Sequence, residues 1–399
     1  MNRIRGSIFF SVLAAMLGLM LIAPIMPPLI RELGMKESHS GLIISLGSIM
    51  MAVMAPVWGR WSDRGRKPII LIGFIGMSVS CALFALALYG GLNAWIGGGL
   101  LLTLLIVTRS LIGMFIPAVL SSAQAYMGDV TEGEERGSGM AIISAANGLG
   151  LVFGPAIAGA FTLIGLLWPL YFGIFIAIAA FIIALLLIPA AKPVIQAKPP
   201  KVNPFQRGLR MYLAAGLVTM MGIMTLQVVG GFYFQDQLAL SPAATARMVS
   251  FGLMFSGAAM LIMQVIQMKW LKWQPRPMIL LGSLFLIASM ILFLVFNVLS
   301  MYYFSFFLFG MGSGLMMPGF MAGASLAVSK EQQGGAAGLV AAIQGISAVI
   351  TPLLTTTLYQ VDKHVPFMLV AVLVVMLAIM MLGMRKKQSN TVTDPIHSL

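Results

Sequence analysis

Charged residues are scarce in this sequence. Aspartate, glutamate, lysine and arginine make up 9% of its 399 residues, whereas hydrophobic residues make up 60%. A soluble domain carries about 25% charged residues, so the composition excludes an ordinary soluble globular protein. Cysteine is almost absent too, because Cys81 is the only one. A single cysteine excludes an intramolecular disulfide and a cysteine metal cluster.

The signatures of several other classes are also missing. The sequence has no Gly-x-x-x-x-Gly-Lys-Ser/Thr loop for ATP phosphates, so it is not a primary pump. No histidine–carboxylate cluster lies within an apolar run, which argues against a membrane-embedded metalloenzyme. No segment between apolar runs is long enough for the output domain of a sensor. We therefore expect no enzyme activity and no bound cofactor.

The hydrophobic residues form twelve long runs, and a bilayer-spanning helix needs about 20 such residues. The runs are continuous rather than alternating, so they predict helices and not barrel strands. The first run is too long for a signal peptide and ends among Pro24, Pro27 and Pro28, which predicts a retained helix with a kinked end. The expected spans are 8–30, 39–58, 69–90, 98–120, 138–163, 167–189, 209–234, 245–268, 278–297, 300–326, 335–360 and 365–384.

Basic residues are distributed unequally between the loops. If both termini lie on one side, the loops of that side hold 19 of the 24 lysines and arginines, and one more is inside a span. The opposite loops hold only Arg31, Lys36, Arg247 and Lys363. Basic loops stay in the cytoplasm, so both termini are expected there, in a bacterial inner membrane. The net charge of +13 thus reflects topology and does not indicate a nucleic-acid partner.

The chain divides into two similar halves. Residues 190–210 contain four prolines and five basic residues, a composition typical of a linker. Gly113 and Pro117 of the fourth span recur at the same spacing as Gly314 and Pro318 of the tenth. The domains expected from these features are an N-terminal six-helix bundle (1–189), a cytoplasmic linker (190–208) and a C-terminal six-helix bundle with a short tail (209–399).

Three polar or glycine-rich motifs stand out in the first half. The loop from Gly59 to Pro68 places Asp63 among four cations, so it either holds neighbouring helices in one conformational state or only sets topology. Arg109 lies inside the fourth span, where a cation costs at least about 2.5 kcal/mol, so it is either functional or a structural arginine satisfied by neighbouring helices. Gly150 and Gly154 form a smooth strip beside Pro155, for a helix contact that is either a mechanistic hinge or ordinary packing.

Together these motifs resemble the major facilitator superfamily, in particular its twelve-span drug:proton antiporters. The Gly59–Pro68 loop is similar to the family's Gly-x-x-x-Asp-Arg-x-Gly-Arg-Lys motif, and Arg109 with Gly113 resembles its Arg-x-x-x-Gly motif. Residues 150–159 resemble the antiporter motif of the fifth helix, and residues 125–131 resemble the end of helix four in tetracycline-type exporters. The resemblance implies an all-α membrane protein of the major-facilitator fold, with two pseudo-symmetric six-helix bundles and a substrate site between them. It implies a conformational role for Gly59, Asp63, Arg64, Arg66, Lys67, Asp129, Gly150, Gly154, Pro155 and Gly159.

The motifs also depart from the family pattern. The loop lacks one residue between Arg64 and Gly65, so Arg66 and Lys67 sit one place early. Ile112 replaces the usual glutamine before Gly113, and Ala160 replaces the second glycine of the final pair. These departures weaken the transfer of single-residue roles and leave the fold unaffected.

A proton-coupled exporter usually needs a carboxylate in its cavity, since protonation removes the cost of burying its charge. None of the eleven acidic residues lies at the centre of an expected span. Asp236, just after the seventh span, is the first candidate for coupling, and Glu32, after the first span, is the second. Arg109 is the third coupling candidate. A solvated loop acid at the outer mouth is an equally good interpretation of Asp236.

Few polar side chains lie within the spans, and each either contacts substrate or bridges helices. The 33 methionines suit promiscuous apolar ligands, although most of them are expected to face lipid. The candidates for the substrate cavity are Asn147, Gln227, Phe234, Gln264 and Gln344.

The leading hypothesis is a secondary active exporter of small amphiphilic, drug-like compounds, working by alternating access. The proton gradient is the expected energy source, and a small-molecule substrate and the lipid bilayer are the expected partners of a monomer. The alternative is an exporter of one endogenous metabolite, such as a siderophore or sugar derivative.

Overall fold

The computed structural model describes residues 2–131, 135–189, 202–206, 208–271, 273–329 and 332–383. Most of the expected linker and the end of the C-terminal tail lie outside these residues. Twelve helices in the described part are long and apolar enough to cross a membrane, which confirms the all-α membrane class. The first half contains α1 (Asn2–Met20), α2 (Met26–Glu32), α3 (Glu37–Ser62), α4 (Arg66–Leu92), α5 (Gly98–Val130), α6 (Glu135–Phe161) and α7 (Trp168–Leu187). The second half contains α8 (Leu209–Leu238), α9 (Pro242–Ile266), the π-helical turn η1 (Gln267–Leu271), α10 (Pro275–Val295), α11 (Leu299–Leu326), α12 (Gln333–Val361) and α13 (Val365–Leu382).

The first expected span is two helices rather than one kinked helix. α1 ends at Met20, and the short α2 begins at Met26 with Pro27 and Pro28 in its first turn. Proline lacks the backbone N–H that would continue the preceding helix, but it fits the first turn of a new one. The break therefore covers residues 21–25, around Pro24, and α2 is a separate helix.

Two other helices run past the ends of their apolar runs. α5 continues to Val130, about ten residues beyond the expected end, and α8 continues to Leu238. Asp129 and Asp236 therefore lie on helices, and Asp236 does not stand in a loop after the seventh span. Helix propagation favours polar residues as readily as apolar ones, so a hydropathy boundary marks the bilayer and not the end of the helix.

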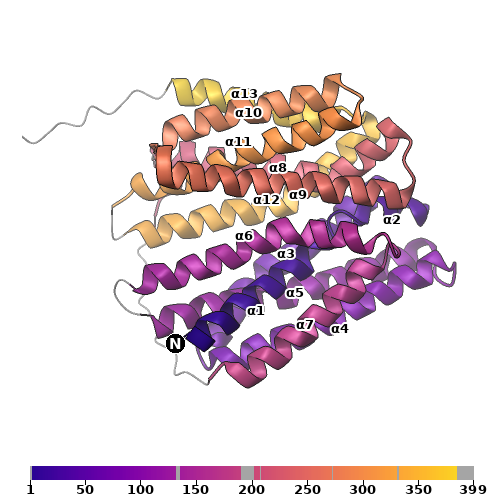
Figure 1. Ribbon diagram of the computed structural model, residues 1–399, viewed down its shortest axis with the longest axis horizontal. Coiled ribbons are helices and arrows are strands. Elements are labelled where there is room, and N and C mark those ends of the chain that lie inside the picture. Colours follow the sequence, from indigo (N-terminus) through magenta and orange to yellow (C-terminus); the bar gives the residue numbers. More distant parts are fainter. Residues whose placement is uncertain are drawn as a thin grey trace, which may run out of the picture.

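The two halves show the same pattern of helix neighbours. α1 packs against α6 and α7, as α8 packs against α12 and α13. α5 packs against α3 and α4, as α11 packs against α9 and α10. Figure 1 shows the two bundles side by side, with the first half below and the second above.

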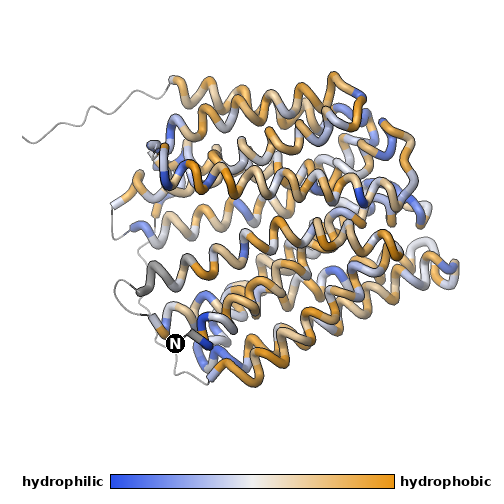
Figure 2. Tube along the Cα trace, viewed as in Figure 1, coloured by the Kyte–Doolittle hydropathy of each residue, from blue (hydrophilic) through white to orange (hydrophobic). Residues whose placement is uncertain are grey.

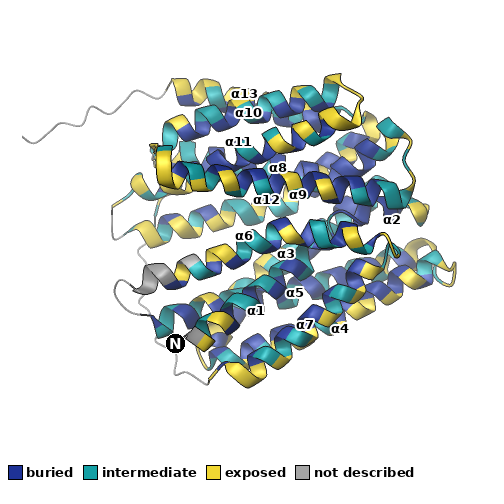
Figure 3. Ribbon diagram, viewed as in Figure 1, coloured by how far each residue is buried: buried dark blue, intermediate teal, exposed yellow. Residues whose placement is uncertain are grey.

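The start of α1 and the end of α13 lie at the same end of the bundle (Figure 1). We call this end, where α1 begins and α13 finishes, the terminal end, and the opposite end, where α2 lies, the α2 end. Orange, hydrophobic residues dominate the length of the helices in Figure 2. Large apolar side chains are exposed on the outer faces, including Leu86 (61%), Phe175 (66%) and Leu186 (73%), and Figure 3 shows such exposed positions along the outer helices. A soluble surface rarely exposes so much apolar area, so these faces fit a bilayer.

Glycine lets the helices inside each half pack backbone to backbone. A Cβ atom on Gly113 of α5 would lie 2.1 Å from the carbonyl oxygen of Gly47 on α3. Gly314, the counterpart of Gly113 in the repeat, would place a Cβ 2.7 Å from the carbonyl oxygen of Met260 on α9. Such close approaches make each half a tightly packed body.

This packing predicts a selective loss of stability on adding one methyl group. Gly113→Ala forces α5 away from the backbone of α3, an overpacking that costs about 1–3 kcal/mol. Gly345→Ala on α12 is the matched control, because its Cβ would meet nothing within 4 Å. Thermal unfolding of the detergent-purified variants should therefore show a lower midpoint for Gly113→Ala only. Equal midpoints would contradict the packing described.

Candidate functional site between the two halves

The two halves meet closely at the α2 end. A Cβ on Gly41 of α3 would lie 2.6 Å from the carbonyl oxygen of Pro352 on α12. A Cβ on Gly159 of α6 would lie 2.5 Å from the Cβ of Ser250 on α9, and one on Gly231 of α8 would lie 2.7 Å from Pro27 on α2. The halves are therefore in van der Waals contact at this end, with no room for even a methyl group.

The halves separate toward the terminal end. Figure 1 shows α6 and α9 close together at the α2 end and splayed apart at the other. Gly338 and Gly345, toward the terminal end of α12, have nothing within 4 Å of a Cβ position. The halves are thus in close contact at the α2 end, and their helices are splayed apart at the terminal end.

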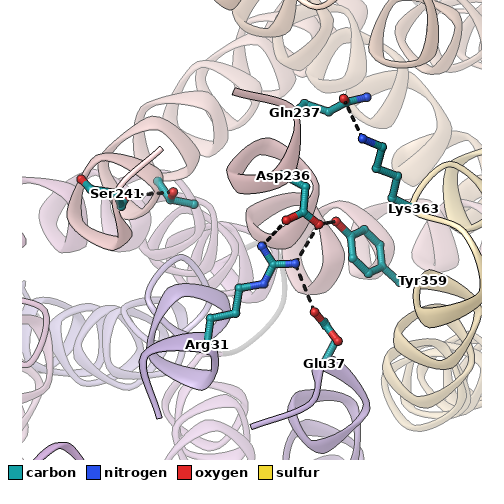
Figure 4. A network of polar contacts seen from close by, with 8 residues as sticks. Arg31, Glu37, Asp236, Gln237, Ser241, Tyr359 and Lys363 are labelled. Carbon is teal, nitrogen blue, oxygen red and sulfur yellow. Dashed lines mark hydrogen bonds and ion pairs between the residues drawn. The ribbon is translucent and has the colours of Figure 1, made fainter. Parts of the chain in front are cut away.

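A polar network joins the halves at the closed end. Arg31 of α2 forms a two-pronged ion pair with Asp236 of α8, in which Nη2 donates to Oδ2 at 2.7 Å. The same guanidinium donates to Oε1 of Glu37 at 3.1 Å, and the hydroxyl of Tyr359 on α12 donates to Asp236. Figure 4 shows Arg31 reaching from the first half to Asp236 of the second, with Glu37 bonded to Arg31 and Tyr359 bonded to Asp236. We call these four residues the Arg31 network.

The surroundings of the Arg31 network strengthen its ion pairs. The exposed fractions of the Arg31, Glu37 and Asp236 side chains are 22%, 23% and 33%, so water screens them only in part. The Arg31 guanidinium also lies 5.3 Å from the centroid of the Phe232 ring, where the ring's negative face attracts a cation. Burial alone would lower the pKa of Arg31, but hydrogen bonds to Asp236 and Glu37 hold that pKa above its ordinary value. Arg31 is therefore charged at every physiological pH.

The three coupling candidates lie in different surroundings. Asp236 belongs to the Arg31 network, so its interpretation as a solvated loop acid is wrong. Glu32 is exposed beside that network and has no ion pair with another described residue. Arg109 is only 7% exposed, packs against Gly47 of α3, and has no hydrogen-bond partner for its Nε among the described residues. The structure does not bring these three residues together.

A second charged cluster lies at the terminal end of the first half. Arg66 donates to Asp63 at 2.7 Å, to Asp129 at 2.8 Å and to Ser62 at 2.8 Å. Its side chain is 5% exposed and that of Asp129 is 2% exposed. The Gly59–Pro68 loop therefore does more than set topology, because it ties the α3–α4 turn to the end of α5.

The other loop candidates have lesser roles in this arrangement. Lys67 donates to the carbonyl oxygen of Leu185, near the end of α7, at 2.8 Å. Arg64 is exposed and forms no ion pair with a described residue. Gly59 has nothing within 4 Å of a Cβ position, so close packing does not require a glycine there.

The glycine strip of α6 faces two different partners. Cβ atoms on Gly150 and Gly154 would lie 2.5 Å from the Cβ atoms of Met16 and Met20, both on α1. Gly159, one turn further along, faces α9 of the other half instead. α6 thus links a tight contact inside the first half to the contact between halves.

A small cavity lies where α6 meets α8, α9 and α11. Its volume is about 40 Å³, room for a few water molecules but not for a drug-sized ligand. Leu151 and Pro155 line it from the first half and Gln227 from the second, together with Ile223, Leu226, Leu253, Ser256, Gly257, Met260, Phe309 and Ser313. The cavity is therefore part of the interface between the halves.

The other cavity candidates do not line this space. Asn147, Gln264 and Gln344 are partly exposed on α6, α9 and α12 but are not among the lining residues. Phe234 is fully buried, and its ring packs against Phe293, Tyr302 and Phe306 inside the second half. Phe234 follows Gln227 by seven residues and so lies two turns nearer the α2 end, where aromatic rings fill the bundle.

Sequence reasoning missed three members of the Arg31 network, namely Arg31, Glu37 and Tyr359. Arg31 is one of only four basic residues expected in the outer loops, and that rarity was a usable signal. Tyr359 gave no signal, because a tyrosine near the end of a span is ordinary at a membrane interface.

Comparisons with known proteins agree with this architecture. The family model of the Major Facilitator Superfamily matches residues 8–300 and 266–396. Multidrug resistance protein 1 of Bacillus subtilis (strain 168) is 25% identical over 363 residues, covering 88% of this chain and 89% of that protein. The quinolone resistance protein NorA of Staphylococcus aureus (strain COL) is 24% identical over 376 residues, covering 92% of both.

Solved structures show the same fold at low sequence identity. A bacterial homologue of the human lysosomal transporter Spinster, in an inward-facing and unoccupied conformation, has a TM-score of 0.73 at 13% identity, over 95% of this chain and 96% of that one. A bacterial homologue of the iron transporter ferroportin in an inward-facing state has a TM-score of 0.75 at 12% identity, over 96% of this chain and 98% of that one.

The Arg31 network predicts how the closed end responds to mutation. Arg31→Ala leaves Asp236 partly buried without its cation, and charge-assisted hydrogen bonds of this kind contribute about 1.5–3 kcal/mol. The ratio of open to closed α2 ends should then rise about 10- to 150-fold. Spin labels at Asn93 and Val298, exposed residues at the α2 end of the two halves, would report this change as a longer distance in a Cys81→Ser background.

Glu32→Gln is the matched control, since Glu32 adjoins Arg31 but lies outside the network. Its distance distribution should equal that of the unmutated protein. The gating role of Arg31 would be ruled out if both variants gave the same distribution.

Proposed function

This chain belongs to the Major Facilitator Superfamily, and we propose that it is a proton-driven exporter of small amphiphilic, drug-like compounds that works by alternating access. The observation that carries the proposal is the contrast between the two ends of the interface. The halves touch at the α2 end through glycine contacts and a breakable polar network, and they are splayed at the terminal end. Two repeated bundles around a shared interface are the architecture in which rocking exposes a central site to each side in turn.

The distribution of basic residues between the loops indicates how the protein is oriented in the membrane. By the positive-inside rule the terminal end is cytoplasmic, in a bacterial inner membrane. The conformation described is then open to the cytoplasm and closed to the outside. A substrate enters from the cytoplasm or the inner leaflet, and release requires the α2 end to open.

The Arg31 network acts as the outer gate. Arg31 and Glu37 move with the first half, whereas Asp236 and Tyr359 move with the second, so outward opening must separate them. Substrate binding shifts the equilibrium only by its differential affinity for the two states, and a gate of a few kcal/mol is within that range. Arg66, Asp63 and Asp129 hold the cytoplasmic end of the first half as one body during the change.

Protons act on this gate through Asp236. The closed end is stabilised by the charged carboxylate, so a proton on Asp236 removes the ion pair and favours opening. Stability of the closed end is thus present at neutral pH and is lost as the pH on the outer side falls. A proton bound to Asp236 from the outer side therefore favours the outward-open state. Arg109, a buried cation without a carboxylate partner among the described residues, is proposed as a second coupling residue.

The substrate class rests on the relatives and on the interior. Two relatives aligned over most of this chain are named for multidrug and quinolone resistance. The lining of the interface cavity is mainly aliphatic and aromatic, with a methionine that can repack around different ligands. The protein is proposed to act as a monomer, since each chain contains both halves of the interface.

Transport by the purified protein tests this function. In proteoliposomes with an imposed pH gradient, a panel of neutral fluorescent amphiphiles should accumulate against its concentration gradient, and collapse of the pH gradient should abolish accumulation. Siderophores and sugar derivatives in the same assay test the alternative of a single metabolite. Accumulation of one metabolite and of no amphiphile would contradict the proposal.

Asp236→Asn separates gating by protons from transport itself. The variant cannot change charge, so facilitated counterflow should persist while accumulation driven by the pH gradient falls at least about tenfold. Glu32→Gln should keep both activities. Unchanged pH-driven accumulation in Asp236→Asn would exclude Asp236 from coupling.

A further inference from the structure

The cavity between α6, α8, α9 and α11 is lined by polar side chains that have no hydrogen-bond partner among the described residues. The hydroxyl of Ser313 is buried and has no hydrogen-bond partner in the described part of the chain. The amide of Gln227 and the hydroxyl of Ser256 also lack a hydrogen bond to any described residue. Buried polar groups are nearly always paired, so the unpaired hydroxyl of Ser313, beside two further polar groups without a partner, calls for an explanation.

Other hydroxyls on the same helices do form hydrogen bonds with the helix backbone. Thr219 and Thr225 on α8 each donate to the carbonyl oxygen four residues earlier at 2.7 Å, and Ser305 on α11 does the same at 2.8 Å. This is the usual arrangement for serine and threonine in membrane helices. Ser313, two turns beyond Ser305 on α11, does not adopt it. Some other buried hydroxyls are also unpaired, but Ser256 and Ser313 are the serines that line this cavity.

The cavity has no charged lining residue. The only charged residue more than two turns from either end of a described span is Arg109, a cation. A monovalent cation placed in this interior would therefore lose its hydration without gaining an anion, which is strongly unfavourable. An uncharged acceptor such as a carbonyl or a phosphoryl oxygen can instead receive hydrogen bonds from the Gln227 amide and the serine hydroxyls.

We propose that this cavity is a head-group subsite for uncharged amphiphiles that carry a hydrogen-bond acceptor, with Gln227 and Ser313 as the recognising donors. The inference rests on the proposed transport function and names its substrate class. The volume of about 40 Å³ fits a head group, and the apolar body of the ligand lies against the surrounding aliphatic chains of both halves. Because Leu151 and Pro155 belong to the first half, rocking of the halves changes the size of the subsite.

The test uses two probes of the same propeller shape but different charge. Triphenylphosphine oxide is neutral and has one strong acceptor, whereas tetraphenylphosphonium is a cation without an acceptor. Calorimetric titration of the full chain in lipid nanodiscs, corrected with empty nanodiscs, should give a dissociation constant at least about tenfold lower for the oxide. Equal or tighter binding of the cation, or no binding of the oxide, would overturn the proposal.

Isosteric variants locate the subsite. Gln227→Glu should reverse the preference, and its cation binding should strengthen from pH 6 to pH 8, because the buried carboxyl must ionise to accept the cation. Ser313→Ala should weaken oxide binding about five- to tenfold without changing cation binding. Gln344→Glu on α12, outside the cavity lining, is the control and should leave both affinities unchanged.

Two results would contradict the assignment of the subsite, and a third would contradict only the transport function. Equal effects of Gln227→Glu and Gln344→Glu would show a general charge effect. Oxide binding insensitive to both Ser313→Ala and Gln227→Glu would mean that the cavity holds structural water only. Binding is measured without a gradient, so loss of export with retained oxide selectivity would refute the transport function and leave the subsite intact.

Discussion

The ion pair between Arg31 and Asp236 is the charged interaction on which the closed state depends, because it joins two halves that are otherwise held at the α2 end by close helix packing and a hydrogen bond from Gln360 to Ser38. Inside a bilayer, lipid tails are as apolar as leucine, so burying apolar surface between helices gives little net driving force. The halves pack closely at the α2 end through glycines, but close packing alone contributes dispersion energy. It does not give a strong preference for the closed state. A two-pronged charge pair, backed by Glu37, Tyr359 and the Phe232 ring, supplies that preference.

The strength of this ion pair suits a contact that must break when the α2 end opens. A fully buried pair would be costly to form and very costly to break, whereas an exposed pair would contribute almost nothing. With about a fifth to a third of each side chain exposed, the Arg31 network lies between these limits. The contact between Gly113 and Gly47 inside the first half is of another kind, since it brings two helix backbones together without an ion pair. A rocking mechanism requires two rigid halves and a contact between them that can form and break.

The sequence predicted the helices better than it predicted which residues of different helices contact one another. Continuous apolar runs located twelve spans, and the spacing of Gly150 and Gly154 correctly indicated a close helix contact. Hydropathy could not place the ends of α5 and α8, because helices continue into polar residues. The partnership of Arg31 with Asp236, 205 residues apart, arises only when the two bundles are assembled. The cavity is a similar case, since Gln227 was a candidate by polarity but Ser256 and Ser313 look like ordinary helix serines until their unpaired hydroxyls are seen.

Charge reversal across the interface tests the central claim most directly. Arg31→Asp and Asp236→Arg each place like charges together at the α2 end, so each alone should open that end and impair transport. The double variant restores an ion pair with its sign exchanged. The distance between spin labels at Asn93 and Val298, measured in all four proteins, should return in the double variant to a distribution close to that of the unmutated protein. A double variant in which the two openings simply add would show that this pair does not hold the halves together.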